Sequence, residues 1–192
     1  MSEQMHREWM QKAKCGDEHA FTCLVKAYQD KVYSMAFYMT KNRQDAEDVT
    51  QEVFLKVWRS LDTYREEASP GVWIMQIAKN ACFDYLRGRK RAETEPLYEV
   101  YDGEQVERPL ADEDVQSNPA AAAVQDERRQ AVARAIMQLP PEHREVLVLR
   151  YIDGLSYEQM AKVLKERQGT VKSRLWRAKK SLKNILENGN FF

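Results

Sequence analysis

SYEQMAKVLKERQGTVKSRLWRAK, residues 156–179, contains the strongest helix signals of the chain. Ser156, followed by Gln159 three residues later, forms a capping-box pattern, which predicts that a short helix begins here. A polar turn at residues 165–169 follows, and Thr170 is the predicted N-cap of a second helix. The apolar residues of the second helix recur at spacings of three and four and form one stripe. The stretch therefore predicts two helices joined by a tight turn, a helix-turn-helix.

The face of the second helix opposite this apolar stripe is basic and rich in hydrogen-bonding groups. One helix fits the major groove of DNA, an arginine can bind O6 and N7 of guanine together, and a hydroxyl can contact bases or phosphates. The residues predicted to meet DNA are Thr170, Lys172, Ser173, Arg174, Trp176, Arg177 and Lys180. The alternative is an ordinary helical hairpin with a solvated basic face, but the cap, the turn and the polarity together favour DNA binding.

Acidic and basic residues are segregated along the chain, although its formal net charge is zero. Residues 92–125 carry nine acidic side chains and one arginine, a net charge of −8, whereas residues 156–183 carry nine basic and two acidic side chains, a net charge of +7. A strongly basic segment needs a polyanionic partner, most commonly nucleic acid. The acidic segment contains three prolines and a glycine and lacks helical periodicity, so it predicts a linker.

Helices are predicted on both sides of this linker, and no convincing strand is found. The chain has only seven glycines and six prolines, and its long runs of Ala, Leu, Glu, Lys, Arg, Gln and Met favour helix. In the N-terminal part, Asp17 and Asp45 are the predicted N-caps of two helices, and Ser69 with Pro70 predicts the start of a third. In the C-terminal part, the diproline at residues 140–141 ends one helix and starts the next.

The predicted fold class is all-α, with two small helical domains joined by a flexible acidic linker. The predicted boundaries are residues 1–92 for the first domain, 93–118 for the linker and 119–192 for the second domain. In the third helix of the first domain, Trp73 and Ile77 are among the residues predicted to make apolar contacts.

Several classes of protein are disfavoured by the sequence. The first ten residues contain no apolar stretch of signal-peptide length, and no segment approaches the roughly 20 apolar residues of a membrane span, so we expect a cytoplasmic protein. Cys15, Cys23 and Cys82 are widely spaced and are predicted to be small buried apolar residues rather than disulfide partners or zinc ligands. Because no catalytic set, phosphate loop or metal cluster emerges, we expect no enzyme, no cofactor, no metal site and no small-molecule substrate.

The helix-turn-helix resembles a known family in detail. Residues 153–161, DGLSYEQMA, and residues 169–178, GTVKSRLWRA, are similar to the promoter-reading helix-turn-helix of bacterial RNA polymerase sigma factors, specifically the extracytoplasmic-function group (group 4) of the sigma-70 family. Residues 139–146, LPPEHREV, match the helix that precedes it in this family. Where many members have Cys-Pro or Ile-Pro before Gly-Thr-Val, this chain has Arg167-Gln168, a departure that concerns the turn and not the helix after it.

The N-terminal part resembles the same family. Residues 45–54, DAEDVTQEVF, continuing to Trp58, are similar to the segment by which these sigma factors dock on the clamp helices of polymerase. Residues 73–80, WIMQIAKN, continuing to 84–87, DYLR, resemble the segment that engages the minus-10 element. The resemblance covers most of both predicted domains and implies a sigma-2-like helical bundle followed by a sigma-4-like helix-turn-helix.

This resemblance implies roles for individual residues. Docking on core polymerase would use Asp45, Asp48, Gln51, Glu52 and Leu55. Engagement of the minus-10 element would use Asp62, Tyr64, Arg65, Asn80, Asp84, Arg87, Arg89, Lys90 and Arg91. Within this set, Asn80 and the loop at residues 61–69 would form the pocket for a flipped base. The helix-turn-helix residues named above would read the minus-35 element.

The function implied by the resemblance is that of an alternative sigma factor. Such a protein binds core RNA polymerase through the clamp helices of the β′ subunit and the β flap, directs it to specific promoters and helps to open the minus-10 region. Promoter DNA and polymerase are therefore implied partners. The family adds an anti-sigma factor, often membrane-anchored, that holds the sigma factor inactive.

Two other functions fit the residues alone. A stand-alone helix-turn-helix regulator would bind a palindromic operator as a dimer, without polymerase. A helical adaptor would use its basic face to bind an acidic protein. Some assigned residues also have purely structural alternatives: Asp48 and Glu52 as solvated charges, Asn80 as a surface amide, and Tyr64 packed under its loop. Trp73 is predicted to pack in the core rather than to wedge DNA.

Overall fold

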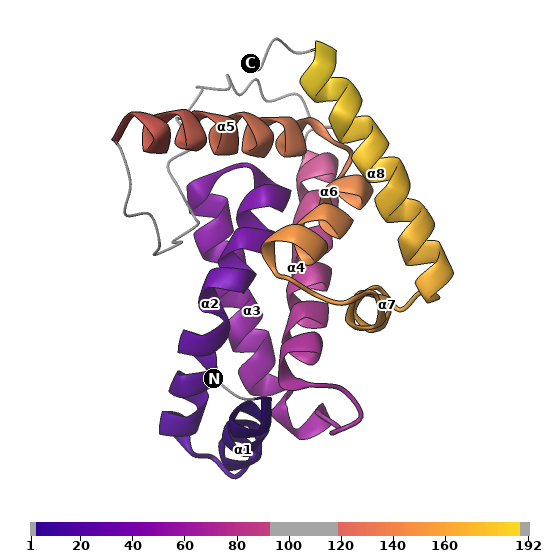
Figure 1. Cartoon of the computed structure of the whole chain (residues 1–192). Helices are drawn as coiled ribbons and strands as arrows, with labels where there is room; N and C mark the ends of the chain where they lie inside the picture. Colours follow the sequence, from indigo (N-terminus) through magenta and orange to yellow (C-terminus); the bar gives the residue numbers. More distant parts are fainter. Residues whose placement is uncertain (1–2, 93–118, 189–192) are drawn as a thin grey trace.

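The computed structural model describes residues 3–92 and 119–188, and all regular structure within them is helical (Figure 1). The first domain contains α1 (Glu3–Lys14), α2 (Glu18–Thr40), α3 (Arg43–Arg59), the 3-10 turn η1 (Leu61–Thr63) and α4 (Pro70–Ala92). The second contains α5 (Pro119–Gln138), α6 (Pro141–Leu147), the π-helical turn η2 (Val148–Ile152), α7 (Tyr157–Leu164) and α8 (Gln168–Asn188). The all-α, two-domain prediction is confirmed, whereas the predicted linker at 93–118 lies outside the described residues.

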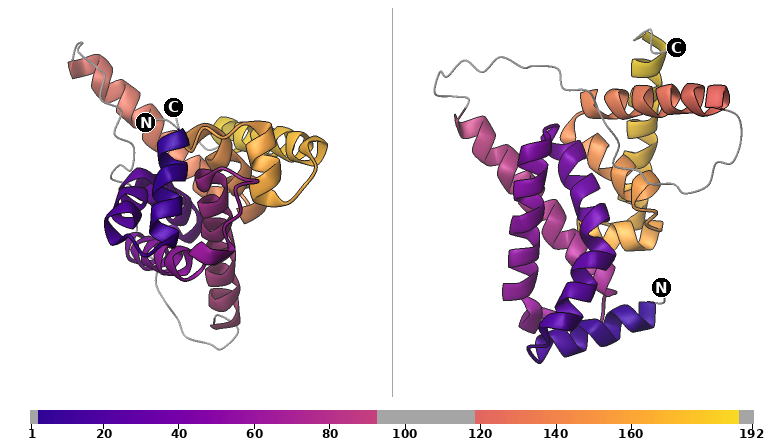
Figure 2. Two further views of the ribbon diagram at one scale, coloured as in Figure 1. Left: turned by 90° about the horizontal axis from the view of Figure 1, so that it is seen from below. Right: turned by 90° about the vertical axis from the view of Figure 1, so that its left-hand side faces the viewer.

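The body of the first domain is a bundle of α2, α3 and α4, and α1 crosses one end of it (Figures 1 and 2). The fully buried residues of α3 are Ala46, Val49, Val53 and Val57, at spacings of three and four. Such spacing places them on one face of the helix, so that α3 packs on α2 and leaves its polar face in solvent. Burial of a valine stabilises the fold by roughly 1.5–3 kcal/mol, which makes this stripe a main determinant of the bundle.

Helix starts follow the predicted capping chemistry, with one correction. The Asp17 side chain accepts a hydrogen bond from the amide of Ala20 at 2.9 Å and caps α2 as predicted. Ser69 likewise accepts from Val72, directly before Pro70. The prediction that Asp45 caps α3 is wrong: Asn42 is the cap, and its side chain accepts from the amide of Asp45 at 3.0 Å. Both residue types cap helices well, so the sequence pattern did not distinguish them.

Two apolar assignments also need correction. In α4, Trp73 and Ile77 are only half-buried, whereas Ile74 and Met75 are fully buried, so the stripe that faces the core is rotated from the predicted one. Among the cysteines, Cys82 is buried as predicted, Cys23 is half-buried and Cys15 is exposed. Cys15 lies just after the last residue of α1, in the turn that leads to α2.

The helix-turn-helix has the predicted capping box but a shorter turn. Ser156 accepts from the amide of Gln159 at 3.2 Å, and the Gln159 side chain accepts from the amide of Ser156 at 2.9 Å. Lys165 adopts the left-handed conformation with φ of 56° and ends α7. Because α8 begins at Gln168, Thr170 lies in its first turn and is not the N-cap that the sequence predicted.

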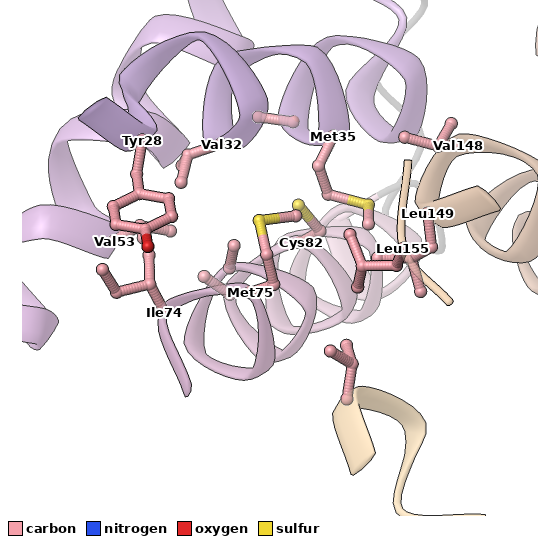
Figure 3. Close-up of a cluster of buried hydrophobic side chains, with 14 of the residues drawn as sticks. Tyr28, Val32, Met35, Val53, Ile74, Met75, Cys82, Val148, Leu149 and Leu155 are labelled. Carbon is pink, nitrogen blue, oxygen red and sulfur yellow. The ribbon is translucent and has the colours of Figure 1, made fainter. Parts of the chain in front are cut away.

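The two domains pack against each other through a shared apolar core. Figure 3 shows Met35 and Cys82 of the first domain close to Val148, Leu149 and Leu155 of the second. Val148 and Leu149 belong to η2, which contacts α2, while α7 contacts α4. Polar contacts between the domains accompany this core. Lys31 donates to the carbonyl oxygen of Asp153 at 3.3 Å, and Gln76 donates to the carbonyl oxygen of Lys162 at 2.6 Å.

Arg144 of α6 is a buried cation at this domain junction. One of its terminal nitrogens donates to the carbonyl oxygens of Tyr38 and Met39 at 2.9 and 3.0 Å, and the other to those of Met137 and Leu139 at 3.1 and 2.7 Å. These carbonyls lie at the C-terminal ends of α2 and α5, where helix dipoles attract positive charge. Burial lowers the pKa of Arg144 to about 10, so it remains charged at neutral pH.

Arg144→Met should lower the free energy of unfolding by about 3 kcal/mol, because buried carbonyls at two helix ends lose a charged donor. Arg150→Met is the matched control, since Arg150 donates to Leu155 at 2.8 Å within the second domain. We expect that change to lower stability by about 1 kcal/mol. Urea denaturation of both variants measures the difference, and equal losses would contradict the role given to Arg144.

Candidate nucleic-acid interface

The exposed face of α8 carries most of the residues predicted to meet DNA. Trp176 is 64% exposed, and the ammonium of Lys180 lies 5.6 Å from the centre of its ring. The hydroxyl of Ser173 donates to the carbonyl oxygen of Thr170 at 2.9 Å. The exposed members of the predicted set are Thr170, Lys172, Ser173, Trp176, Arg177 and Lys180. They form a polar, positively charged surface opposite the buried residues of α8.

Arg174 does not belong to this exposed face. Its side chain is 21% exposed, forms an ion pair with Glu166, and lies 3.6 Å from Glu145. Glu166 follows α7 and Glu145 belongs to α6, so Arg174 joins three segments of the second domain. In this arrangement its guanidinium is used by carboxylates within the protein.

Glu145 is a buried carboxyl, with its side chain only 2% exposed. Within the described residues its Oε1 atom has no hydrogen-bond partner. Burial raises its pKa to about 7, although the positive charges of Lys79 and Arg174 act in the opposite direction. Asp153, in the turn before α7, is also buried, and burial raises its pKa to about 7.

The loop between α3 and α4 lies next to the predicted base pocket, but Tyr64 is not available on its surface. Tyr64 is 2% exposed, and its hydroxyl donates to the carbonyl oxygen of Ala68 at 2.8 Å. Its ring packs edge-on against Trp73, with centroids 5.4 Å apart. In this structure Tyr64 therefore packs under its loop, which is the alternative to a base contact. The exposed residues of this predicted site are Asp62, Arg65 and Asn80.

The basic end of α4 is only partly available to phosphates. Arg87 is exposed and forms an ion pair with Asp84, whereas Lys90 and Arg91 are exposed at the end of the helix. Arg89 is half-buried and lies 3.8 Å from Asp45. The Tyr85 hydroxyl also donates to Asp45 at 2.5 Å. Asp45 and Arg89, predicted for different sites, thus contact each other.

The predicted docking residues on α3 are otherwise exposed. Asp48, Gln51, Glu52 and Leu55 share one face, and Leu55 is 55% exposed. Glu52 forms an ion pair with Lys56 at 2.7 Å. Trp58, 38% exposed and packed on Phe21, extends this face. Trp58 ends the motif that resembles the docking segment but was not predicted as a docking residue, although its i+3 spacing from Leu55 places both on one side of the helix.

A cavity of about 590 Å³ brings residues of the two predicted DNA-binding surfaces together. From α4 it is lined by Lys79, Asn80, Phe83, Asp84 and Arg87, and from the second domain by Glu142, Glu145, Leu164, Glu166 and Arg174. The predicted base-pocket residue Asn80 and the predicted base reader Arg174 therefore line one space. In this closed arrangement Arg174 is the only residue of the predicted α8 set that lines the cavity, while the exposed members of that set lie outside it.

A second, apolar groove of about 450 Å³ lies on the second domain and was not found from the sequence. It is lined by Val132, Ile136, Leu147, Tyr151, Lys179, Leu182, Lys183, Leu186 and Glu187. Tyr151 is 59% exposed beside it. One sequence feature could have indicated this groove: the apolar stripe of α8 continues beyond the helix-turn-helix.

Across residues 3–92 and 119–188, none of the helices is both long and apolar enough to cross a membrane. The same residues contain no group of histidine, cysteine, aspartate and glutamate side chains suited to hold a metal ion.

Comparisons with known proteins place this architecture in a class. Residues 24–92 match the family Sigma-70 region 2, and residues 129–182 match Sigma-70, region 4. The chain is 35% identical over 188 residues to the ECF RNA polymerase sigma-E factor of Escherichia coli K12, covering 97% of both proteins. It is 33% identical over 187 residues to the RNA polymerase sigma-H factor of Pseudomonas aeruginosa, covering 97% of this chain and 96% of that protein.

Solved structures agree on the fold. CnrH in complex with the cytosolic domain of CnrY aligns with a TM-score of 0.68 at 24% identity, covering 95% of this chain and 97% of that one. The sigma factor RpoE of Bartonella quintana, in complex with the anti-sigma factor NepR, aligns with a TM-score of 0.65 at 22% identity, covering 88% and 97%. Fold and sequence together define a sigma-70-type sigma factor. The chain belongs to the extracytoplasmic-function (ECF) family of RNA polymerase sigma factors.

The buried carboxyl of Glu145 makes stability depend on pH. Because its pKa rises from the usual 4.5 to about 7, the folded protein binds more protons than the unfolded chain between these values. The free energy of unfolding should therefore fall by about 2 kcal/mol as pH rises from 5 to 7.5, with Asp153 acting in the same direction. Urea denaturation at both pH values measures this change.

Glu145→Gln should reduce this pH dependence because the amide does not titrate. Glu158→Gln is the control, since Glu158 is exposed on α7 and pairs with Lys162. A pH dependence as steep in Glu145→Gln as in the wild type would contradict the role of this carboxyl.

Proposed function

We propose that this chain is a group 4 alternative sigma factor, which binds core RNA polymerase, directs it to specific promoters and helps to open the minus-10 region. The observation that carries this proposal is the pairing of an exposed basic recognition face on α8 with a second polar face on α4, in a chain of the ECF sigma factor family. The protein acts in the cytoplasm, and polymerase performs the chemistry of RNA synthesis.

The exposed face of α8 reads the minus-35 element. Arg177 is exposed and can reach base edges or phosphates, and the hydroxyls of Thr170 and Ser173 are exposed beside it. Arg174 has a different role in this proposal: paired with Glu145 and Glu166, it orients α8 against α6 and α7. Base reading by Arg174 would require it to leave these carboxylates.

The face of α4 and the loop at residues 61–69 engage the minus-10 element. Asn80 is exposed and offers both a donor and an acceptor to the edge of an unstacked base. Arg87, Lys90 and Arg91 provide phosphate contacts, which add affinity without sequence information. Flipping a base costs a few kcal/mol, which stacking and edge hydrogen bonds offset.

Core polymerase docks on two surfaces of the chain. The exposed face of α3, with Asp48, Glu52 and Leu55, meets the clamp helices of the β′ subunit. The apolar groove beside Tyr151 receives the β flap, because its 450 Å³ volume and apolar lining suit the apolar side of a helix.

Promoter binding requires the closed arrangement to open. The minus-35 and minus-10 elements are named for their positions relative to the transcription start site, so they lie about 25 base pairs apart. This distance is about 85 Å of duplex at 3.4 Å per base pair. Arg174 of α8 and Asn80 of α4 line one cavity of about 590 Å³, so the helices that carry the two surfaces lie much closer together than that length. We propose that an anti-sigma factor stabilises the closed form and that core polymerase separates the domains.

Run-off transcription with core polymerase tests this function. The wild-type chain should direct initiation at discrete positions, which a stand-alone regulator or an adaptor would not do. A gel shift without polymerase, at about 0.15 M salt, provides the opposite test. Tight binding of the free protein to a palindromic site, together with no specific transcript, would favour the dimeric regulator.

Run-off transcription with the variant Arg177→Ala measures how much this residue contributes to promoter specificity. If Arg177 reads a base, this change should cost about 1–3 kcal/mol at the cognate minus-35 sequence and relax preference at one position. Lys165→Ala, which removes a cation from the turn before α8, is the control.

Glu52→Lys should weaken binding to core polymerase by about tenfold, because it places a cation where the basic clamp helices are proposed to meet a carboxylate. Asp30→Lys, the same type of charge reversal on the exposed side of α2, should leave affinity unchanged. Fluorescence anisotropy of the labelled chain against core enzyme measures both. Equal affinities for the two variants would remove α3 from the docking surface.

A further inference from the structure

Helix α1 contacts the loop that the proposed function assigns to the unstacked base. The match to Sigma-70 region 2 begins at residue 24, so α1 precedes the matched residues. It nevertheless packs on η1 and on α4, the two elements that flank the loop at residues 61–69. Figures 1 and 2 show α1 across the end of the bundle where α3 gives way to α4.

Polar side chains of α1 hold this loop by its backbone and by a side chain. Arg7 donates to the carbonyl oxygen of Glu66 at 3.0 Å, and Lys14 donates to that of Tyr64 at 3.1 Å. The amide of Gln11 donates to the carboxylate of Glu66. Arg7, Gln11 and Lys14 are spaced by four and three residues, so one side of α1 presents all of them to the loop.

The loop is also fixed from within. The side chain of Tyr64 is buried against Trp73, and its hydroxyl donates to the carbonyl oxygen of Ala68 at 2.8 Å. Tyr64 is therefore held twice, by α1 at its carbonyl oxygen and by the loop's own backbone at its hydroxyl. Contacts with α1 on one side and with Trp73 of α4 on the other thus fix the conformation of residues 64–68.

A second contact ties α1 to the start of α4. The Tyr28 hydroxyl lies 2.8 Å from Nδ1 of His6, and the Tyr28 ring covers Gly71 in the first turn of α4. A Cβ atom at position 71 would come within 2.9 Å of that ring, so glycine permits this close packing. The end of the loop that leads into α4 is thereby placed relative to α1.

Order in this loop has a consequence for base capture. A loop that becomes ordered only when the base arrives loses conformational entropy at that step, whereas a loop that is already ordered does not. We propose that α1 is a positioning element for promoter opening, whose Arg7, Gln11 and Lys14 side chains hold residues 61–69 in the shape that receives the unstacked base. The inference rests on the proposed function of that loop.

The free protein provides the first test. Lys14→Met removes the donor to Tyr64 while keeping an unbranched side chain, and should raise the rate of trypsin cleavage after the exposed Arg65 by about tenfold. Lys14→Arg, which restores a cationic donor, should return the rate to near the wild-type value. Lys12→Met removes the same charge from an exposed position of α1 and is the matched control.

Holoenzyme provides the second test, on a promoter mapped by run-off transcription. 2-Aminopurine is placed in turn at each position of the non-template minus-10 strand, because its fluorescence rises when a base leaves the stack. Lys14→Met should reduce the rate of the rise about tenfold while affinities for core enzyme and for duplex promoter stay unchanged. Gln11→Met, a change at an exposed residue that leaves the fold intact, should give a smaller loss in the same direction.

The outcomes separate this inference from the function on which it rests. If Lys14→Met is cleaved after Arg65 at the wild-type rate, or shows the wild-type rate of fluorescence rise, the positioning role alone is overturned. Loss of core affinity along with base capture would also overturn it, because α1 would then support the whole domain. Absence of any fluorescence rise with wild-type holoenzyme would overturn the proposed function itself.

Discussion

The hydrogen bonds of the Arg144 guanidinium hold the ends of two helices together at the domain junction. Its partners are carbonyl oxygens at the ends of α2, in one domain, and of α5, in the other. A buried cation is tolerated only where such acceptors replace water. The same side chain therefore completes the second domain and fixes that domain against the first. Because Arg144 lies three residues after Pro141, where α6 begins, the diproline helps to define where the cation is placed.

The domain junction combines favourable apolar burial with unfavourable burial of charge. Val148, Leu149 and Leu155 join the core of the first domain, which favours the closed form. Burial shifts the pKa values of Arg144, Glu145 and Asp153 in the directions that disfavour their charged forms. Opening the junction would return some of these groups to water and offset part of the lost apolar burial. A junction of this composition is suited to separation by a large partner that supplies its own contacts.

Local chemistry in the sequence predicted much of the fold, and the contacts between distant segments account for most of what it missed. The capping box at Ser156, the caps Asp17 and Ser69 and the diproline break depend on neighbouring residues, and each is present. The burial of Tyr64 and the internal ion pairs of Arg174 were not predicted, because their orientation depends on Ala68 and Trp73 in one case and on Glu145 and Glu166 in the other. The spacing of apolar residues predicts which side of a helix is exposed. It does not predict that another segment places a carboxylate beside that side. For the same reason, the cavity between the domains had no signal in the sequence.

The positions of the exposed surfaces suggest an order of events for the proposed function. The proposed docking residues of α3 are exposed while the domains are closed, whereas Asn80 and Arg87 of α4 line the cavity shared with the second domain. Polymerase could therefore reach α3 before the domains separate, whereas DNA that contacts Asn80 and Arg87 would have to enter the cavity beside the second domain. If docking on α3 comes first, the energy of that contact and of the apolar groove is available to open the junction. Promoter binding by the free protein would have to supply this energy alone, so under the proposed function the two faces would engage DNA together only with polymerase.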